Sequence, residues 1–292
     1  MSFAIFTDTS ANLPAELVEQ HHITIIPFSY YIDGQEHTCA DPRAFDGKAY
    51  YDAIRNGLQV STSQVNPQRY IDYMQPALAQ GQDILFVGLS SGVSGSFNSA
   101  TMAAAQLLEQ FPERNIRLVD SLGAALGEGL LVVRAVECRD AGQDLNQTAD
   151  FLDNLRHRIY QVFTVGDLMH LRRTGRITGA TAVLGSVLNI KPILKGNAQG
   201  QIVSFLKARG RKRAIELLAE KYNALAVEPE KQTVAITHAD CLEDALLLQQ
   251  LICQKRPPKQ ILMACHEPAT GSHVGPGMLA VYFEGDTQVR QK

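Results

Sequence analysis

Residues 83–100 read DILFVGLSSGVSGSFNSA, an apolar run followed by a turn of serines and glycines. Residues 84–89 are apolar apart from one glycine, which is typical of a strand buried in a parallel sheet. From Ser99 on, small residues and helix formers predict a helix. In an open α/β sheet, such a strand–turn–helix junction lies at the carboxyl edge, where ligands bind. The stretch therefore predicts an α/β fold with a ligand site at residues 90–96, which we call the serine turn.

The serine turn has three interpretations. Residues 88–92 (GLSSG) fit the G-x-S-x-G nucleophile elbow of α/β-hydrolases, with Asp120 and a late histidine in the run 266–277 as triad partners. Alternatively, the hydroxyls and the free N–H groups of the helix start bind a carboxylate or phosphate. The third interpretation is a serine-rich helix cap. Few strands precede Ser90 and no HGGG-type segment is present, which weakens the hydrolase interpretation.

Composition restricts the class of protein. The chain has 292 residues, 45% hydrophobic and 20% charged, with a formal net charge of −3, so it predicts a globular protein and no nucleic acid partner. No apolar run approaches the ~20 residues that span a bilayer, and no leader sequence is recognisable at the start. We therefore expect a cytoplasmic location without stable membrane insertion, and transient contact with a membrane surface stays open.

The five cysteines are scattered and form no C-x-x-C pair, which indicates reduced thiols and no metal site. Hydrophobic periodicity and turn residues predict the remaining elements. The predicted strands cover residues 2–6, 23–32, 116–119, 159–165, 190–194, 201–206, 233–237, 261–264 and 278–283. The predicted helices start near Pro14 and Pro67 and cover residues 45–56, 99–108, 123–138, 145–157, 167–174, 178–188 and 240–254.

Polar segments connect these elements. Residues 60–67 are expected to form a loop that shares a site with the serine turn, and residues 266–277 a second loop. Asp240 is the expected N-cap of its helix. The pattern predicts two α/β domains, residues 1–157 and 158–292. The first would be a three-layer α/β/α domain with a mostly parallel sheet, and the second would have a mixed sheet.

Taken in order, eight segments resemble the DegV family of fatty-acid-binding proteins, which includes the B component of bacterial fatty acid kinase. These segments are Thr7–Thr9, Ser61–Gln64, Ser90–Ser96, Val119–Ser121, Leu171–Ile177, Lys191–Ile193, Arg209–Gly210 and His273–Gly277. Two departures are visible. Val65-Asn66 replaces the usual Pro-Ser, and Thr174 stands where a glycine is usual. Neither departure affects the hydroxyls of these segments.

The resemblance implies a deep apolar tunnel between the two domains that holds one long-chain fatty acid, such as palmitate, stearate or oleate. Its carboxylate would be bound by Thr62 and Ser94, with support from Ser91 and the backbone N–H of Gly95. Uncharged donors can compensate a buried carboxylate, and each buried CH₂ contributes about 0.8 kcal/mol of affinity. The depth of the tunnel, which the sequence does not give, would set the preferred chain length.

The same resemblance implies that a separate ATP-dependent kinase phosphorylates the bound carboxylate. The chain would then carry fatty acid and acyl phosphate and catalyse nothing itself, without a cofactor. Arg176 and His273 would lie near the head group, and Arg209 and Arg211 would contact the kinase. Two alternatives remain. One is a serine hydrolase that acts on lipid esters through Ser90 or Ser94. The other is a phosphate-binding α/β module, although the sequence has neither G-x-G-x-x-G nor a P-loop.

Overall fold

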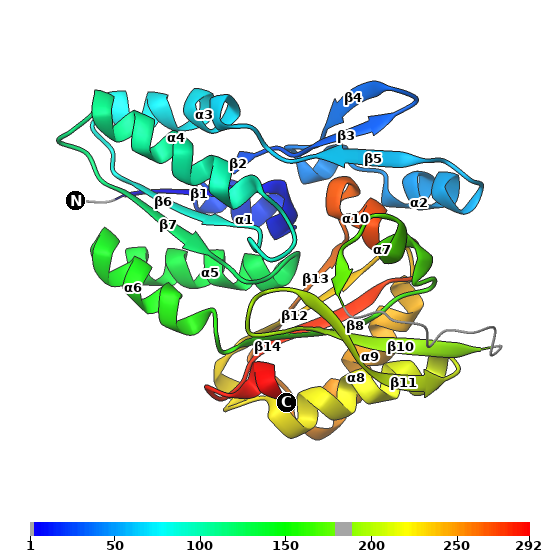
Figure 1. The fold of residues 1–292 in the computed structure, drawn as a ribbon. Helices are drawn as coiled ribbons and strands as arrows, with labels where there is room; N and C mark the ends of the chain where they lie inside the picture. The colour runs from blue at the N-terminus through cyan, green and yellow to red at the C-terminus, as the bar shows by residue number, and fades with distance from the viewer. Residues whose placement is uncertain (1–2, 179–188) are drawn as a thin grey trace.

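The computed structural model of the chain describes residues 3–178 and 189–292, which form two main sheets and a small third one (Figure 1). The helix predicted over residues 178–188 lies outside the described residues, apart from Thr178. Within the described ranges, no helix has the length and apolar character needed to cross a membrane.

The first sheet is parallel and has the strand order β2-β1-β6-β7. Its strands are β1 (Ala4–Asp8), β2 (Thr24–Ile26), β6 (Ile84–Gly88) and β7 (Ile116–Asp120). Strand β6 is buried along its whole length between β1 and β7. The apolar run that precedes the serine turn is therefore a central strand, as predicted.

Helices cover both faces of this sheet (Figure 1). Phe86 of β6 packs in one apolar cluster with α3 (Pro67–Ala79) and α4 (Ser96–Gln110). Leu85, on the opposite face, packs with α5 (Leu126–Asp140) and α6 (Leu145–Leu155). Successive strand residues point to opposite faces, so the four apolar side chains of β6 need helices on both sides. The three-layer arrangement is confirmed.

The small sheet is antiparallel and consists of β3 (Ser29–Ile32), β4 (Gln35–Thr38) and β5 (Val60–Ser63). The sequence predicted one strand over 23–32, which is wrong. Pro27 offers no backbone N–H, and the chain leaves the parallel sheet there, so β2 and β3 belong to different sheets. The predicted loop over 60–67 is likewise wrong in its first half, since β5 pairs with β3.

The second main sheet is mixed, with the order β13-β12-β14-β8-β10-β11-β9. Its strands are β8 (Ile159–Thr164), β9 (Ile177–Thr178), β10 (Ile190–Gly196), β11 (Ile202–Arg209), β12 (Thr233–His238), β13 (Gln260–Cys265) and β14 (Leu279–Glu284). Helices α8 (Arg211–Leu225) and α9 (Leu242–Lys255) pack on one face through a separate apolar cluster. Asp240 does not cap α9 as predicted. Cys241 is the N-cap, and Asp240 accepts a hydrogen bond from Arg55 instead.

Shorter elements complete the fold. They are α1 (Ala15–Gln20), α2 (Gly47–Arg55), α7 (Met169–Arg173), α10 (Pro268–Val274) and the 3₁₀ turns η1 (Thr9–Ala11), η2 (Pro42–Ala44), η3 (Pro229–Lys231) and η4 (Val289–Gln291). Helix α10 corrects the loop predicted over 266–277. Its start is a Glu267 N-cap followed by Pro268.

The face of the mixed sheet opposite α8 and α9 is directed toward the first sheet. Helix α5 lies between the two sheets (Figure 1), and its residues share a cluster with Ala235, Ala280 and Tyr282 of the mixed sheet. The carboxyl edge of the parallel sheet thus lies beside a face of the mixed sheet. The predicted domain boundary at 157/158 falls between the two sets of strands and stays a prediction.

Candidate functional site

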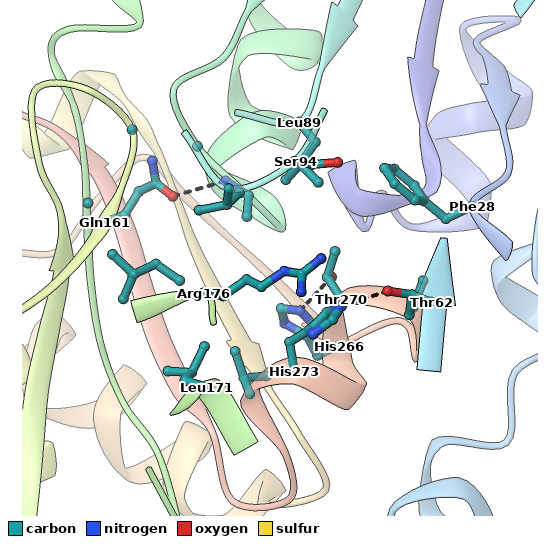
Figure 2. Close-up of a pocket in the computed structure, with 18 of the residues that line it drawn as sticks. Phe28, Thr62, Leu89, Ser94, Gln161, Leu171, Arg176, His266, Thr270 and His273 are labelled. Atoms are coloured by element: carbon teal, nitrogen blue, oxygen red, sulfur yellow. Dashed lines mark hydrogen bonds between the residues drawn. The ribbon is translucent and has the colours of Figure 1, made fainter. Parts of the chain in front are cut away.

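A cavity of about 250 Å³ lies between the two sheets, at the carboxyl edge of the parallel one. The serine turn, the end of β5, the loop after β7, the mixed sheet and α10 all contribute to its wall. Most lining side chains are apolar, among them Phe28, Phe163, Leu171, Val274 and Met278. Polar side chains gather at one end, where Thr62, Ser94, Arg176 and His273 lie (Figure 2).

The serine turn presents Ser94 and Gly95 to this end of the cavity. The Oγ atoms of Ser94 and Ser96 lie 2.9 Å apart, and the N–H of Ser96 donates to Ser94 Oγ at 3.2 Å. Gly95 lies close to the Gln64 side chain, which would have to move to make room for a Cβ atom at this position. Helix α4 begins at the next residue, so free N–H groups of its first turn accompany the hydroxyl. Such a junction can bind an anion.

Thr62 and His273 meet across the same end. Figure 2 shows the two side chains pointing toward each other, with 2.8 Å between Thr62 Oγ1 and His273 Nε2. Burial, and after it the positive charge of Arg176, lowers the pKa of His273 to about 4. The imidazole is therefore neutral at physiological pH. Its Nδ1 is buried and has no partner among the described residues.

A second histidine, which the sequence analysis missed as a lining residue, lies beside this pair. His266 Nε2 is 2.9 Å from Thr270 Oγ1, and both residues line the cavity. Burial lowers the pKa of His266 to about 3, so this imidazole is also neutral. Glu267 accepts from the backbone N–H groups of Ala269 and Thr270 and fixes the start of α10. In the sequence, the pair Glu267-Pro268 is typical of a helix start, and this signal could have indicated that His266 lies directly before a helix.

Gln161 is a further lining residue that the sequence analysis did not single out. It comes from β8 and lies opposite Thr62 (Figure 2). Its Oε1 accepts from the N–H of Ala124 at 3.1 Å, and its Nε2 donates to the carbonyl of Leu122 at 3.2 Å. Gln161 therefore holds the loop after β7 against the mixed sheet. In the sequence, the signal for Gln161 was that it is a polar residue inside an otherwise apolar strand.

The remaining serines of the turn do not form a triad. Ser90 is 1% exposed, and its Oγ donates to the carbonyl of Gly200 at 2.9 Å and accepts from Gly92 N–H at 3.1 Å. Asp120 accepts from the Oγ of Ser91 at 2.5 Å and from its N–H at 3.2 Å. Among the described residues, no serine bonds to a histidine. The hydrolase interpretation is not supported, because the geometry of a nucleophile and its base is missing.

The other predicted site residues lie elsewhere. Ser91 does not line the cavity, and its supporting role stays a prediction. Arg209 is exposed at the end of β11. Arg211 forms an ion pair with Asp244 at 2.8 Å, so its charge already has an intramolecular partner. In the parts of the chain that the structure describes, no cluster of three His, Cys, Asp or Glu side chains could hold a metal ion.

The comparisons of this chain with known proteins agree on one family. A family model described as "Uncharacterised protein, DegV family" matches residues 2–286. A DegV domain-containing protein of Clostridium perfringens is 38% identical over 286 residues, which is 98% of each chain.

Two solved structures have the same fold. One, described as fatty acid binding of a DegV family protein from Thermus thermophilus, has a TM-score of 0.88 and 28% identity, and covers 98% of this chain and 100% of that one. The other is a DegV family protein of Ruminococcus gnavus refined with vaccenic acid. It has a TM-score of 0.88 and 25% identity, with 97% and 99% of the two chains covered. With matching sequence segments, fold and relatives over nearly its whole length, the chain belongs to the DegV family.

Proposed function

We propose that this protein binds one long-chain fatty acid in the cavity between its sheets. The observation that carries the proposal is the Thr62–His273 pair at one end of a largely apolar cavity. Apolar walls suit an acyl chain, and a cluster of donors at one end suits a single carboxylate. The fatty acids in the Thermus and Ruminococcus relatives support the same ligand class for this chain.

The head group would be bound mainly by uncharged donors. The candidate groups, all of which line the cavity, are the hydroxyls of Thr62 and Ser94, the N–H of Gly95, the neutral His273 ring and the Arg176 guanidinium. A carboxylate buried without hydrogen bonds is very costly, and these groups would offset that cost. The tail would contribute most of the affinity, at about 0.8 kcal/mol per buried CH₂.

We further propose that the protein is a cytoplasmic carrier that presents the carboxylate to a separate ATP-dependent kinase and has no catalytic chemistry of its own. The family resemblance supports the kinase partner. Arg209 agrees with a contact role, since it is exposed and no described carboxylate forms an ion pair with it. Arg211 is a weaker candidate for this contact because it is paired with Asp244.

The ligand proposal is tested by removing one hydroxyl. We predict that Thr62→Val weakens the binding of oleate about 10- to 100-fold, because a hydrogen bond to a charged group contributes about 1.5–3 kcal/mol. The change keeps the β-branched shape that suits a strand. Dissociation constants are measured by calorimetry on delipidated protein.

Thr148→Val is the matched control. Thr148 is fully buried in α6, outside the cavity wall, and its hydroxyl has no partner among the described residues. Its replacement should leave oleate affinity unchanged. Equal affinities for wild type and Thr62→Val would refute the assignment of the head group to this end of the cavity.

A further inference from the structure

Residues 7–10 (TDTS) include the Thr7–Thr9 segment of the family resemblance, yet none of them lines the cavity. Asp8 is 1% exposed and Glu128, from the first turn of α5, is 0% exposed. Neither side chain lines the cavity. Burying two carboxyl groups side by side is costly, so their arrangement calls for a functional explanation.

Both oxygens of Asp8 accept backbone hydrogen bonds. Oδ1 accepts from the N–H of Ser10 at 2.8 Å, and Oδ2 accepts from the N–H of Leu89 at 3.1 Å. Leu89 lines the cavity and directly precedes the serine turn. Asp8 therefore holds the segment that leads into Ser94 and Gly95.

The neighbouring hydroxyl of Thr9 holds another part of the wall. Its Oγ1 accepts from the N–H of Phe28 at 3.0 Å, and Phe28 lines the cavity. The turn after β1 thus fixes two wall segments that are far apart in the sequence.

Glu128 connects the turn to a third wall segment. Its oxygens accept from Thr7 Oγ1 at 3.0 Å and from Ser10 Oγ at 2.5 Å. Helix α5 begins directly after residues 122–124, which line the cavity. In this loop Leu122 and Ala125 have φ values of 51° and 53°, an unfavourable region for residues other than glycine. A buried anchor at the start of α5 helps to hold this loop in place.

The two carboxyl groups do not carry two charges. Burial, and after it the charge of Asp8, raises the pKa of Glu128 well above its usual range. Burial raises the pKa of Asp8 to about 6, while hydrogen bonds from Ser10, Leu89 and Glu128 partly oppose the rise. Near neutral pH, Asp8 is therefore mostly ionised, and the raised pKa of Glu128 favours its protonated form.

We propose that Asp8 is a positioning residue for the bound fatty acid, which it does not touch: its carboxylate, beside the buried carboxyl of Glu128, fixes the entrance to the serine turn. The proposal rests on the fatty acid function above. It predicts that an amide cannot replace Asp8, since Asn would accept only one of the two N–H bonds and turn its own NH₂ toward the other. Gln, in contrast, can replace a protonated Glu128.

Other titratable groups face the pair. Tyr70 of α3 and Glu267 before α10 interact with it electrostatically. Burial raises the pKa of Tyr70 far above neutrality and that of Glu267 to about 7. Because Glu267 titrates near the same pH as Asp8, a pH effect is assigned to Asp8 only by comparing variants.

The test compares Asp8→Asn with Glu128→Gln by oleate titration of delipidated protein, with Tm recorded alongside. We expect Asp8→Asn to weaken oleate binding about tenfold, the effect of one misplaced buried hydrogen bond, and Glu128→Gln to change it less than about twofold. Wild-type affinity in Asp8→Asn, with or without a lower Tm, would overturn the proposal. An equal loss in both variants would also overturn it, because Glu128 would then have to be charged.

A pH profile separates positioning from mere stability. Between pH 8 and 5, oleate affinity of the wild type should fall as the pH drops through about 6, where Asp8 takes up a proton and loses an acceptor site. Asp8→Asn should lack this step. Glu128→Gln, which leaves the Asp8 carboxyl and its two backbone hydrogen bonds in place, should keep the step.

The Glu128→Gln result keeps the test decisive even if Asp8→Asn does not fold, since loss of oleate affinity or of the pH step in Glu128→Gln would overturn the proposal. Wild-type protein that binds no fatty acid at all would contradict the proposed function. A wild type that binds normally beside an unaffected Asp8→Asn variant would contradict only the role of Asp8.

Discussion

The Thr62–His273 pair places a neutral ring where a carboxylate would bind. Histidine commonly gains a proton beside an anion, but here burial and the nearby Arg176 keep the pKa of the unliganded ring at about 4. Arg176 can supply the positive charge, so the imidazole is left to act as a hydrogen-bonding group. The Nδ1 atom of His273 is buried and has no partner among the described residues, so the ring forms only the Thr62 bond in the unliganded protein.

This neutral ring predicts a pH-dependent stability of the unliganded protein. In the unfolded chain His273 titrates near 6.5, and in the folded chain near 4. Between these values the unfolded state binds a proton that the folded state does not, so stability falls as the pH drops below about 6.5. From pH 7 to pH 5 the loss should be on the order of 1–2 kcal/mol.

His273→Gln, which keeps a hydrogen-bonding group beside Thr62, should reduce this loss by that amount in urea unfolding. Asp8 and Glu267 have raised pKa values, so their contributions to the pH dependence of stability have the opposite sign. These contributions are the same in wild type and variant, and they cancel when the two pH dependences are subtracted. Identical pH slopes for wild type and variant would contradict a neutral buried His273.

Among the elements, the β10–β11 hairpin contacts the serine turn at the cavity. The hairpin tip reaches Ser90, whose hydroxyl donates to Gly200, and a Cβ atom on Gly92 would lie 2.5 Å from the carbonyl of Gln199. Both Gly200 and the serine turn line the cavity. The hairpin tip therefore packs against the serine turn and forms part of the cavity wall.

Because of this contact, we expect that adding one methyl group at Gly200 changes both the stability of the protein and the release of its ligand. Gly200 has φ 70°, and its Cβ atom would lie 2.1 Å from Ser90 Oγ, whereas Gly142 has φ 82° with no atom within 4 Å. Alanine is strained at both positions, so their difference reports the contact alone. Gly200→Ala should lower Tm more than Gly142→Ala and speed the release of oleate in a stopped-flow assay. Equal effects on both properties would mean that the hairpin tip does not close the cavity.

The elements also explain what the sequence could and could not predict. Strand β6 and the serine turn were visible because a buried strand and a Gly/Ser turn are local patterns. The break at Pro27 was visible too, but assigning β2 and β3 to different sheets needs tertiary partners. Thr62 and His273 are 211 positions apart, and only the family resemblance suggested that they share a site. Glu128 was missed because a lone Glu in a helix pattern ordinarily faces solvent.

For the whole molecule, we predict that ligand binding and the proposed kinase contact are separate properties. Arg209 lies outside the cavity wall, so Arg209→Ala should leave oleate affinity unchanged and lower the rate of acyl phosphate formation by a fatty acid kinase and ATP. Arg134→Ala, which removes a partly exposed arginine of α5 outside the cavity wall, is the control and should affect neither. If Arg209→Ala supports the wild-type rate, the kinase contact lies elsewhere.

The most direct test of the central claim is native mass spectrometry of the purified protein, followed by denaturation and identification of the released molecule. We predict one long-chain fatty acid per chain, bound non-covalently, and a reduced amount in Thr62→Val. A protein that stays empty after incubation with oleate, or that carries a covalent acyl group on a serine, would contradict the account.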